Sequence, residues 1–308
     1  MKLLITGGTG LVGTGIKSIA SEFPEYNISY MSSKDCNLLD YGAVMEYFWH
    51  ESPDCIIHLA ANVGGLYKNM NQKVEMFDDN IQMNLNVIKA AFSNDIKNLI
   101  GTLSTCIFPD NTTYPINETM LHDGAPHTSN DAYAYAKRMI KVQCDAYSAQ
   151  HDVNYSCIIP TNIYGEGDNF SLEDGHVIPA LIHKCFNAVK NGIDFEVYGT
   201  GKPLRQFIYS KDLGRLILKS VYKLMQESII LAPREEVAIG DVARYIARAF
   251  DYEDRMVFND SFSDGQYKKT ADNSKLMELF PDFEFMKIEE GIAETVDYFR
   301  REYPNLRL

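Results

Sequence analysis

Short apolar runs alternate with longer stretches of helical periodicity through the first 160 residues of this 308-residue chain. A short apolar run between turn signals indicates a buried strand, whereas apolar residues three and four positions apart indicate a helix with one buried face. Their alternation predicts a parallel sheet with helices on both faces, a doubly wound α/β fold. We expect strands over 2–6, 27–31, 55–60, 98–103 and 155–160, and helices over 11–23, 43–50, 74–92 and 132–150.

The alternation stops after about residue 162. A turn-rich loop at 165–169 is followed by an expected helix over 176–190 and a short strand over 195–198, and the elements beyond residue 233 are shorter. We therefore expect a second, smaller domain built against the first, with the chain crossing between them more than once.

A glycine-rich turn lies where the first strand should pass into the first helix. It reads Thr6-Gly7-Gly8-Thr9-Gly10-Leu11-Val12-Gly13. Glycines here allow a tight turn and close approach of the backbone to a pyrophosphate, which rests on the N–H groups and positive dipole end of the helix. Glycines are also ordinary turn formers, but this position predicts a Rossmann-type dinucleotide site with contacts from Gly7, Gly10, Leu11, Val12 and Gly13.

The tip of the second strand bears on the choice of cofactor. It reads Tyr30-Met31-Ser32-Ser33-Lys34-Asp35, and an acidic residue at this place usually holds the ribose hydroxyls of NAD. Two hydroxyls and a lysine precede the acid, which suits the 2′-phosphate of NADP better. We therefore expect NADP (as NADPH) with contacts from Ser32, Ser33 and Lys34, and Asp35 keeps NAD open as the alternative.

These observations divide the chain into two expected domains. An NADP-binding Rossmann domain spans 1–162 and also receives about 205–232, and a substrate-binding α/β domain takes the remainder of 163–308. The expected cofactor contacts extend to other strand ends and to the crossover between the domains. They include Leu59, Ala60, Tyr133, Lys137, Pro160, Asn162 and His176.

Three residues in the first domain suggest proton-transfer chemistry. Tyr133 and Lys137 lie one turn apart on a predicted helix, and an ammonium beside a phenol should lower the pKa of the phenol. Such a tyrosine can exchange a proton with a sugar oxygen while hydride moves to or from a nicotinamide. Ser104 follows the fourth strand, whose carboxyl end should face the cofactor crevice. In this order the glycine turn, Ser104 and the Tyr-x-x-x-Lys pair resemble the extended short-chain dehydrogenase/reductase superfamily.

Several further segments narrow this resemblance to the GDP-L-fucose synthase family. The segments are 103–109 (LSTCIFP), 159–165 (IPTNIYG), 168–170 (DNF), 175–180 (GHVIPA), 205–209 (RQFIY) and 263–269 (SDGQYKK). The resemblance covers essentially the whole chain. It implies an NADPH-dependent enzyme that epimerises GDP-4-keto-6-deoxy-D-mannose at carbons 3 and 5 and then reduces carbon 4. It also implies a homodimer paired through two helices of the nucleotide-binding domain.

The residues make chemical sense of this reaction. A ketone at carbon 4 acidifies the protons on both neighbouring carbons, and inversion there needs a base on one ring face and an acid on the other. Cysteine and histidine have pKa values close to 7. By resemblance, Cys106 is the base and His176 the acid, while Ser104 and Tyr133 stabilise the enolate and Tyr133 protonates the oxygen during reduction. We expect a strand end to present Ser104 and Cys106 together.

The substrate diphosphate needs cations from the second domain. Arg205 stands where the family uses an arginine on the substrate phosphates, and Asn162 matches a substrate-contacting asparagine of the family. Lys184, Tyr198 and Lys269 are further expected substrate contacts. His122, Asp123 and His127 share a loop, but their spacing fits no common metal template, and we expect no metal.

Charge and composition narrow the partners and the compartment. The formal net charge is −13, and this excess of acid argues against a general nucleic-acid or anionic-membrane binder. The six cysteines show no Cys-x-x-Cys spacing, and neither a signal peptide nor an apolar run of about 20 residues is evident. We therefore expect a cytoplasmic protein with free thiols, in which a few placed cations hold the anionic ligands.

Two alternatives remain. A sugar-nucleotide 4,6-dehydratase would carry an Asp-Glu pair where this chain has Thr105-Cys106, and a plain 4-epimerase would need no cysteine and histidine pair. A non-catalytic NADP-binding regulator belongs to a different class. The presence of Ser104, Tyr133 and Lys137 together argues against it.

Overall fold

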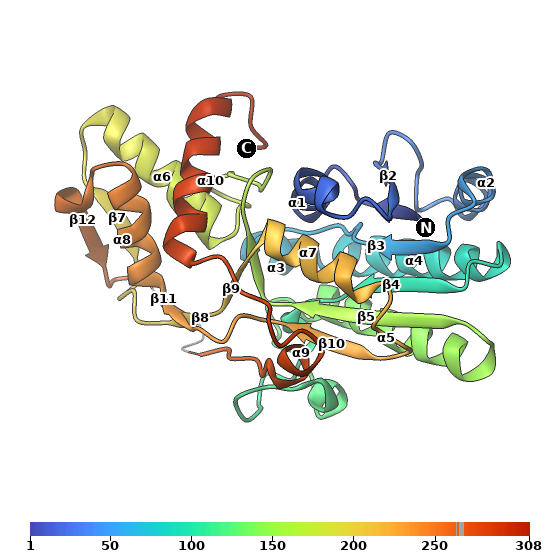
Figure 1. Cartoon of the computed structure of the whole chain (residues 1–308). Helices are drawn as coiled ribbons and strands as arrows, with labels where there is room; N and C mark the ends of the chain where they lie inside the picture. Colours follow the sequence, from blue (N-terminus) through green and yellow to red (C-terminus); the bar gives the residue numbers. More distant parts are fainter. Residues whose placement is uncertain (263, 265–267) are drawn as a thin grey trace.

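The computed structural model describes residues 1–262, 264 and 268–308 (Figure 1). Of the 263–269 segment, Ser263, Gly265, Gln266 and Tyr267 lie outside the described residues. A six-stranded parallel sheet runs through the larger part of the molecule, in the order β10-β5-β4-β3-β1-β2. Its strands are β1 (Lys2–Thr6), β2 (Asn27–Met31), β3 (Cys55–His58), β4 (Asn98–Thr102), β5 (Asn154–Pro160) and β10 (Ser228–Leu231).

Helices cover both faces of this sheet, which confirms the predicted doubly wound α/β fold. On one face, α1 (Leu11–Ile19) packs against α7 (Ser210–Ser220), and α9 (Ser274–Leu279) packs against β10. On the other face lie α2 (Tyr41–Glu51), α4 (Lys73–Ser93) and α5 (Asp131–Gln150), and α3 (Leu66–Asn71) precedes α4. Each face has its own buried apolar cluster, as expected for a sheet whose strands are apolar on both sides.

Two predicted elements end earlier than expected. The helix predicted over 11–23 ends at Ile19 and continues as the 3₁₀ helix Ala20–Glu22, because a residue before a proline, here Phe23, avoids helical backbone angles. The strand predicted over 55–60 leaves the ladder after His58, since Leu59 and Ala60 turn to pack against Gly7.

The second half of the chain forms a separate apolar core beside the carboxyl ends of the strands. It is built from three helices and three two-stranded sheets (Figure 1). The helices are α6 (Val177–Asn191), α8 (Ile239–Ala249) and α10 (Ile288–Glu302). The strand pairs are β6 (Asn162–Tyr164) with β9 (Phe207–Tyr209), β7 (Phe195–Tyr198) with β12 (Met256–Asn259), and β8 (Leu204–Arg205) with β11 (Val237–Ala238).

The chain crosses between the two cores at strands β6 and β9. It leaves the large sheet after β5 through β6, and it returns through β9 and α7 to β10, which pairs with β5. The parallel pairing of β6 and β9 sets Asn162 opposite Phe207, two residues beyond Arg205. Residues that begin the second core are therefore held against the carboxyl edge of the sheet, where ligands of doubly wound folds bind.

Candidate active site

The glycine turn between β1 and α1 is tightly constrained by its neighbours. Gly7 has a φ of +69°, and a Cβ at this position would lie 2.9 Å from the backbone nitrogen of Ala60. The N–H of Gly8 donates to the Met31 carbonyl (2.8 Å), and the N–H of Gly10 donates to the Gly7 carbonyl (3.0 Å). Only glycine fits at position 7, and the turn presents the amino end of α1 at the carboxyl edge of the sheet, a cradle that fits a pyrophosphate.

At the tip of β2, the carboxylate of Asp35 is hydrogen-bonded within its own turn. The backbone N–H and the hydroxyl of Ser32 both donate to the Asp35 carboxylate, at 2.8 and 2.6 Å. These two bonds hold the pKa of Asp35 below its usual range. Ser33 and Lys34 expose their side chains beside it. Because Asp35 is engaged within the turn, the geometry favours a 2′-phosphate on Ser33 and Lys34 over ribose hydroxyls on Asp35.

The Tyr133–Lys137 pair lies on α5 beside the end of β4. Lys137 is 2% exposed, its ammonium donates to the Thr102 carbonyl at 2.9 Å, and it lies 6.0 Å from the ring centroid of Tyr133. Burial lowers the pKa of Lys137 to about 8.

Burial and the neighbouring Cys106 raise the pKa of Tyr133, which contradicts the predicted lowering. The reason is that desolvation of the phenolate outweighs the attraction of an ammonium that is bonded to a carbonyl. A phenol that keeps its proton is the form that can protonate a ketone oxygen.

His58, at the end of β3, supports this pair and was missed in the sequence. Its ring nitrogens bond the Thr6 hydroxyl (2.8 Å) and the Asn84 side chain (3.0 Å). Burial and the Lys137 charge lower the pKa of His58 to about 3, so the ring is neutral. The sequence signal that could have revealed His58 is a polar residue at the end of an apolar strand.

Ser104 and Cys106 lie in a turn and not in a strand. The strand β4 ends at Thr102, and Thr105–Ile107 form a 3₁₀ helix whose N-cap is Ser104. The Ser104 hydroxyl accepts a long bond from the Cys106 N–H (3.5 Å). Both residues therefore lie just beyond the carboxyl end of β4, in a turn that begins as soon as the chain passes the sheet edge. Cys106 is partly accessible, whereas the other five cysteines are buried.

Cys106 opens onto a cavity of about 970 Å³ that also receives Arg205 and Lys269. Cys106 interacts electrostatically with Tyr133 and Lys137 on α5 and with Lys269 in the cavity lining. Burial lowers the pKa values of Arg205 and Lys269. The cavity therefore joins a thiol to two cations from the second half of the chain, an arrangement suited to an anionic ligand.

His176 is the N-cap residue of α6, but its ring takes no part in capping, among the interactions of the described residues. The ring remains accessible to solvent. The groups packed around it and the charge of Arg307 lower the pKa of His176. The lining of the Cys106 cavity, as far as the described residues define it, does not include His176.

The predicted catalytic residues Ser104, Tyr133 and Lys137 also lie outside that lining, as the described chain defines it, and so do three predicted substrate contacts. The Lys184 ammonium lies 3.3 Å from the ring centroid of Tyr198, which stacks on Phe262 at 3.9 Å, and both rings are about half exposed. The Asn162 amide donates to the Gln206 carbonyl at 2.9 Å. The structure thus brings Lys184 and Tyr198 together and holds Asn162 on β6, opposite Phe207, which lies two residues beyond Arg205.

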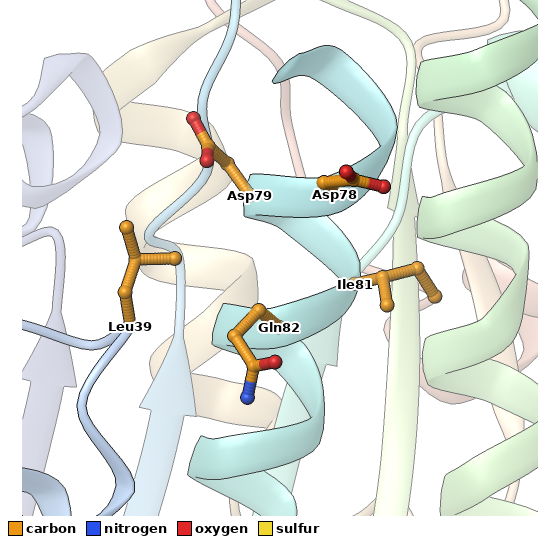
Figure 2. Close-up of a pocket in the computed structure, with 5 residues that line it drawn as sticks. All are labelled: Leu39, Asp78, Asp79, Ile81 and Gln82. Carbon is orange, nitrogen blue, oxygen red and sulfur yellow. The ribbon is translucent and has the colours of Figure 1, made fainter. Parts of the chain in front are cut away.

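A second, smaller hollow lies against α4 (Figure 2). It measures about 390 Å³ and is lined by Leu39, Asp78, Asp79, Ile81 and Gln82. Two carboxylates make it unsuited to phosphate groups, and none of the predicted site residues lines it. The cavity beside Cys106 is therefore the better candidate for a sugar nucleotide.

No group of three or more His, Cys, Asp or Glu side chains in the described chain is arranged to hold a metal ion. In the same residues, every helix is too short or too polar to cross a membrane.

Comparisons with known proteins identify the family to which the chain belongs. Residues 3–230 match the NAD dependent epimerase/dehydratase family. GDP-L-fucose synthase of Dictyostelium discoideum is 47% identical over 99% of this chain and 97% of its own length. GDP-L-colitose synthase of Yersinia pseudotuberculosis is 31% identical over 99% of this chain and 100% of its own length.

A solved structure extends this agreement to three dimensions. The crystal structure of a GDP-L-fucose synthetase from Naegleria fowleri bound to NADP matches with a TM-score of 0.95 and 44% identity. The match covers 100% of this chain and 95% of that one. The chain therefore belongs to the NAD-dependent epimerase/dehydratase family and, within it, to the GDP-L-fucose synthase family.

Proposed function

We propose that this protein converts GDP-4-keto-6-deoxy-D-mannose to GDP-L-fucose by epimerising carbons 3 and 5 and then reducing the ketone at carbon 4. The observation that carries this proposal is the accessible Cys106 beside Tyr133 and Lys137, at a cavity that also holds Arg205 and Lys269. The identity to GDP-L-fucose synthases over nearly the full length supports the same activity.

The proposed catalytic roles follow from the state of each group. Cys106 removes the proton from a carbon next to the ketone, and His176 returns a proton on the opposite ring face. Ser104 and Tyr133 hydrogen-bond the ketone oxygen and stabilise the enolate. Lys137 holds the end of β4 through Thr102 and keeps a positive charge near that oxygen. Tyr133, whose pKa is raised by burial, then donates its proton to the oxygen during reduction.

The proposed cofactor is NADPH, and the glycine cradle fits its pyrophosphate. Gly7, Gly10, Leu11, Val12 and Gly13 would hold the pyrophosphate, and Ser32, Ser33 and Lys34 the 2′-phosphate. Leu59, Ala60, Tyr133, Lys137, Pro160, Asn162 and His176 would line the rest of its path. When bound, the cofactor supplies the hydride. Turnover with NADPH and with NADH tests the choice, and a strong preference for NADH would refute this assignment.

The proposed substrate contacts come from the second half of the chain. Arg205 and Lys269 would bind the diphosphate in the cavity beside Cys106. Lys184 and Tyr198 would contact the nucleoside, and Asn162 the sugar. We also propose that 1–162 with about 205–232 form the NADP-binding domain and the remainder of 163–308 the substrate domain, in keeping with β10 joining the large sheet.

We further propose a homodimer paired through α4 and α5. These two helices pack against each other and expose apolar side chains to solvent, namely Val74, Phe77 and Leu85 on α4 and Tyr135, Met139 and Val142 on α5. Light scattering should give twice the chain mass, and a Leu85→Glu variant should be monomeric. The six unpaired cysteines suit a reducing compartment such as the cytoplasm.

One experiment tests the function directly. The protein is supplied with GDP-4-keto-6-deoxy-D-mannose and NADPH in deuterated water, and we expect NADPH consumption with deuterium at carbons 3 and 5. Reduction without label would refute the epimerase half, and label without NADPH consumption would indicate an epimerase alone. Binding of NADPH with neither reaction would favour the regulatory alternative.

A further inference from the structure

Cys106 and Lys269 meet in the same cavity although they come from distant parts of the chain. The charge of Cys106 raises the pKa of Lys269 against the lowering that burial causes, so the two groups interact. Lys268, the residue just before Lys269, instead pairs with Glu236 at 3.1 Å. The chain thus separates two consecutive lysines, one beside the reactive thiol and one in an ion pair.

The backbone that carries Lys269 is fixed at several points. The Ile116 N–H donates to the Thr270 carbonyl (2.9 Å), and the Asp272 N–H donates to the Ile116 carbonyl (2.8 Å). The buried side chain of Gln206 accepts from the Ala271 N–H at 2.8 Å and donates to the Ala271 carbonyl at 3.1 Å. Gln206 follows Arg205, so one buried amide ties the Lys269 segment to the strand that carries the arginine of the cavity.

The groups around the thiol are mostly cationic or neutral. From α5, Cys106 interacts with Tyr133, Lys137 and Arg138. From the other side of the cavity it interacts with Lys269, which is itself influenced by Arg205 and Asp110. Lys137 donates to the Thr102 carbonyl, and Arg138 donates to the carbonyls of Ile107 and Gly124.

We propose that Lys269 is a positioning residue for the epimerisation, whose ammonium keeps Cys106 in the thiolate form that removes a proton from the sugar. The proposal rests on the proposed function for the identity of the base. The Cys106 thiol first loses its proton to solvent, and Lys269 stays an ammonium throughout. A lone pair of the thiolate sulfur then takes the proton from the carbon beside the ketone. The C–H electron pair becomes that of the enolate, and the sulfur is a thiol again.

The test measures the reactivity of Cys106 in the intact protein without substrate. Iodoacetamide reacts with thiolates, and the other five cysteines are buried, so labelling of the native protein reports on Cys106. Labelling rates are measured by mass spectrometry from about pH 5 to about pH 9.5. An opposite charge nearby moves a pKa by about one to three units. We therefore expect Lys269→Met to raise the labelling midpoint by at least about one pH unit and to slow labelling at neutral pH about tenfold.

Matched variants separate this effect from a loss of structure. Lys269→Arg keeps the charge and should keep the wild-type midpoint, and Lys268→Met removes the neighbouring charge and should leave the midpoint unchanged. Lys269→Gln serves as a second neutral variant, and melting curves establish that each variant is folded. A folded neutral variant whose labelling midpoint equals that of wild type would overturn the proposal. This holds also when the KM for substrate rises in that variant.

The pH profile of deuterium exchange at carbons 3 and 5 separates this proposal from the proposed function. Its acidic limb should move with the labelling midpoint in Lys269→Met. If labelling shifts and the exchange limb does not, the coupling between Lys269 and Cys106 holds, but Cys106 is not the base. That outcome would overturn the catalytic assignment.

Discussion

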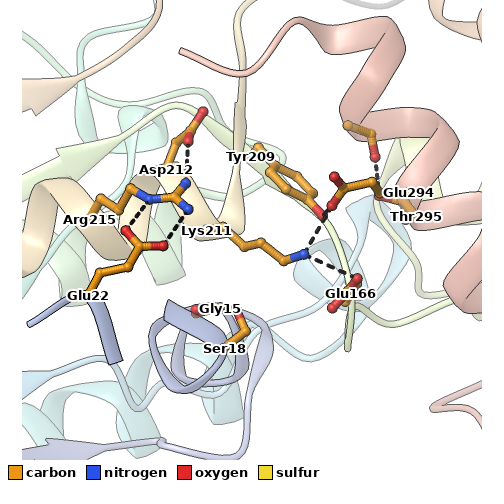
Figure 3. A network of polar contacts seen from close by, with 11 residues as sticks. Gly15, Ser18, Glu22, Glu166, Tyr209, Lys211, Asp212, Arg215, Glu294 and Thr295 are labelled. Carbon is orange, nitrogen blue, oxygen red and sulfur yellow. Dashed lines mark hydrogen bonds and ion pairs between the residues drawn. The ribbon is translucent and has the colours of Figure 1, made fainter. Parts of the chain in front are cut away.

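Two polar clusters of this molecule have opposite balances of charge. The lining of the Cys106 cavity carries Lys73, Arg205 and Lys269 against Asp110, and Lys73 is paired with Asp131 at 2.8 Å. The second cluster, here called the α7 network, joins α7 to the 3₁₀ helix Ala20–Glu22, to the loop after β6 and to α10 (Figure 3). It consists of Glu22, Glu166, Tyr209, Lys211, Asp212, Arg215 and Glu294. In the α7 network, four carboxylates surround two cations.

The contacts of the α7 network are short and mutual. Arg215 binds both oxygens of Glu22 at 2.8 Å and one oxygen of Asp212 at 3.1 Å. Lys211 donates to Glu294 (3.0 Å) and Glu166 (3.3 Å). Each acid therefore meets a donor, and the network connects the two halves of the chain without an excess positive charge to attract an anion.

The difference shows how a chain of net charge −13 can bind anionic ligands. Its acids are placed where cations or N–H groups already meet them, whereas Arg205 and Lys269 face a cavity in which Asp110 is the acidic lining residue among those described. A network in which each acid meets a donor favours structure, and a local excess of positive charge at a cavity favours the binding of an anion. The comparison can be tested by removing charges or protons from each cluster in turn.

The largest effect should follow a change at the reacting groups. Tyr133→Phe removes the proton donor for the ketone oxygen, so the rate of NADPH oxidation should fall by about 10² to 10⁴. Tyr135→Phe is the matched control, because Tyr135 is exposed and two residues away on another helix face. Retention of hydride transfer in Tyr133→Phe would remove Tyr133 from the mechanism.

Substrate affinity should respond next, and only in the cavity. Arg205→Met removes a charge-assisted contact to phosphate, so the KM for the sugar nucleotide should rise about 10- to 100-fold. Arg215→Met, which removes a cation of the α7 network, should leave that KM unchanged. Equal increases in both variants would contradict the separation of binding and structural cations.

Stability should show the reverse ranking. Arg215→Met leaves Asp212, which is 3% exposed, with the Met286 N–H as its remaining hydrogen-bond donor among the described residues. The free energy of unfolding, measured with urea, should fall by about 1–3 kcal/mol. The free energy of unfolding of Arg205→Met should fall by less than that of Arg215→Met. If Arg215→Met unfolded at the same urea concentration as wild type, this result would contradict a structural role for the α7 network.

The first half of the chain was predictable because its elements repeat a strong local pattern. Strands β1 and β2 begin and end where the apolar runs do, and the glycine turn follows from its place between strand and helix. Strands β6, β8, β9 and β11 have two or three residues each and form only through tertiary pairing, so periodicity could not reveal them.

The site was predictable in its residue types and less so in their states. The motifs placed Cys106, Tyr133 and Lys137 together, and the structure agrees. The direction of the Tyr133 pKa shift depends on burial, which no spacing encodes. The same holds for the neutral His58 beneath Lys137 and for Gln206, whose bonds join segments far apart in the sequence. Such contacts become visible only when the fold brings distant segments together.

A pH-dependent effect should come from an acid that belongs to neither cluster. Asp168, in the loop after β6, is 4% exposed, and among the contacts of the described residues its Oδ2 has no hydrogen-bond partner. Burial raises the pKa of Asp168 to about 7, although the Asn169 N–H and the charge of Arg307 oppose the shift.

The folded protein therefore holds one proton more than the unfolded chain between about pH 4 and about pH 7. The stability that this proton contributes is complete below about pH 4 and is lost as the pH rises through about 7, by no more than about 1.4 kcal/mol per pH unit. Asp168→Asn keeps the shape and removes the titration. Urea unfolding from about pH 5 to about pH 8 should show wild type losing stability relative to Asp168→Asn as the pH rises. Parallel curves would mean that Asp168 is already matched by a cation, as the acids of the α7 network are.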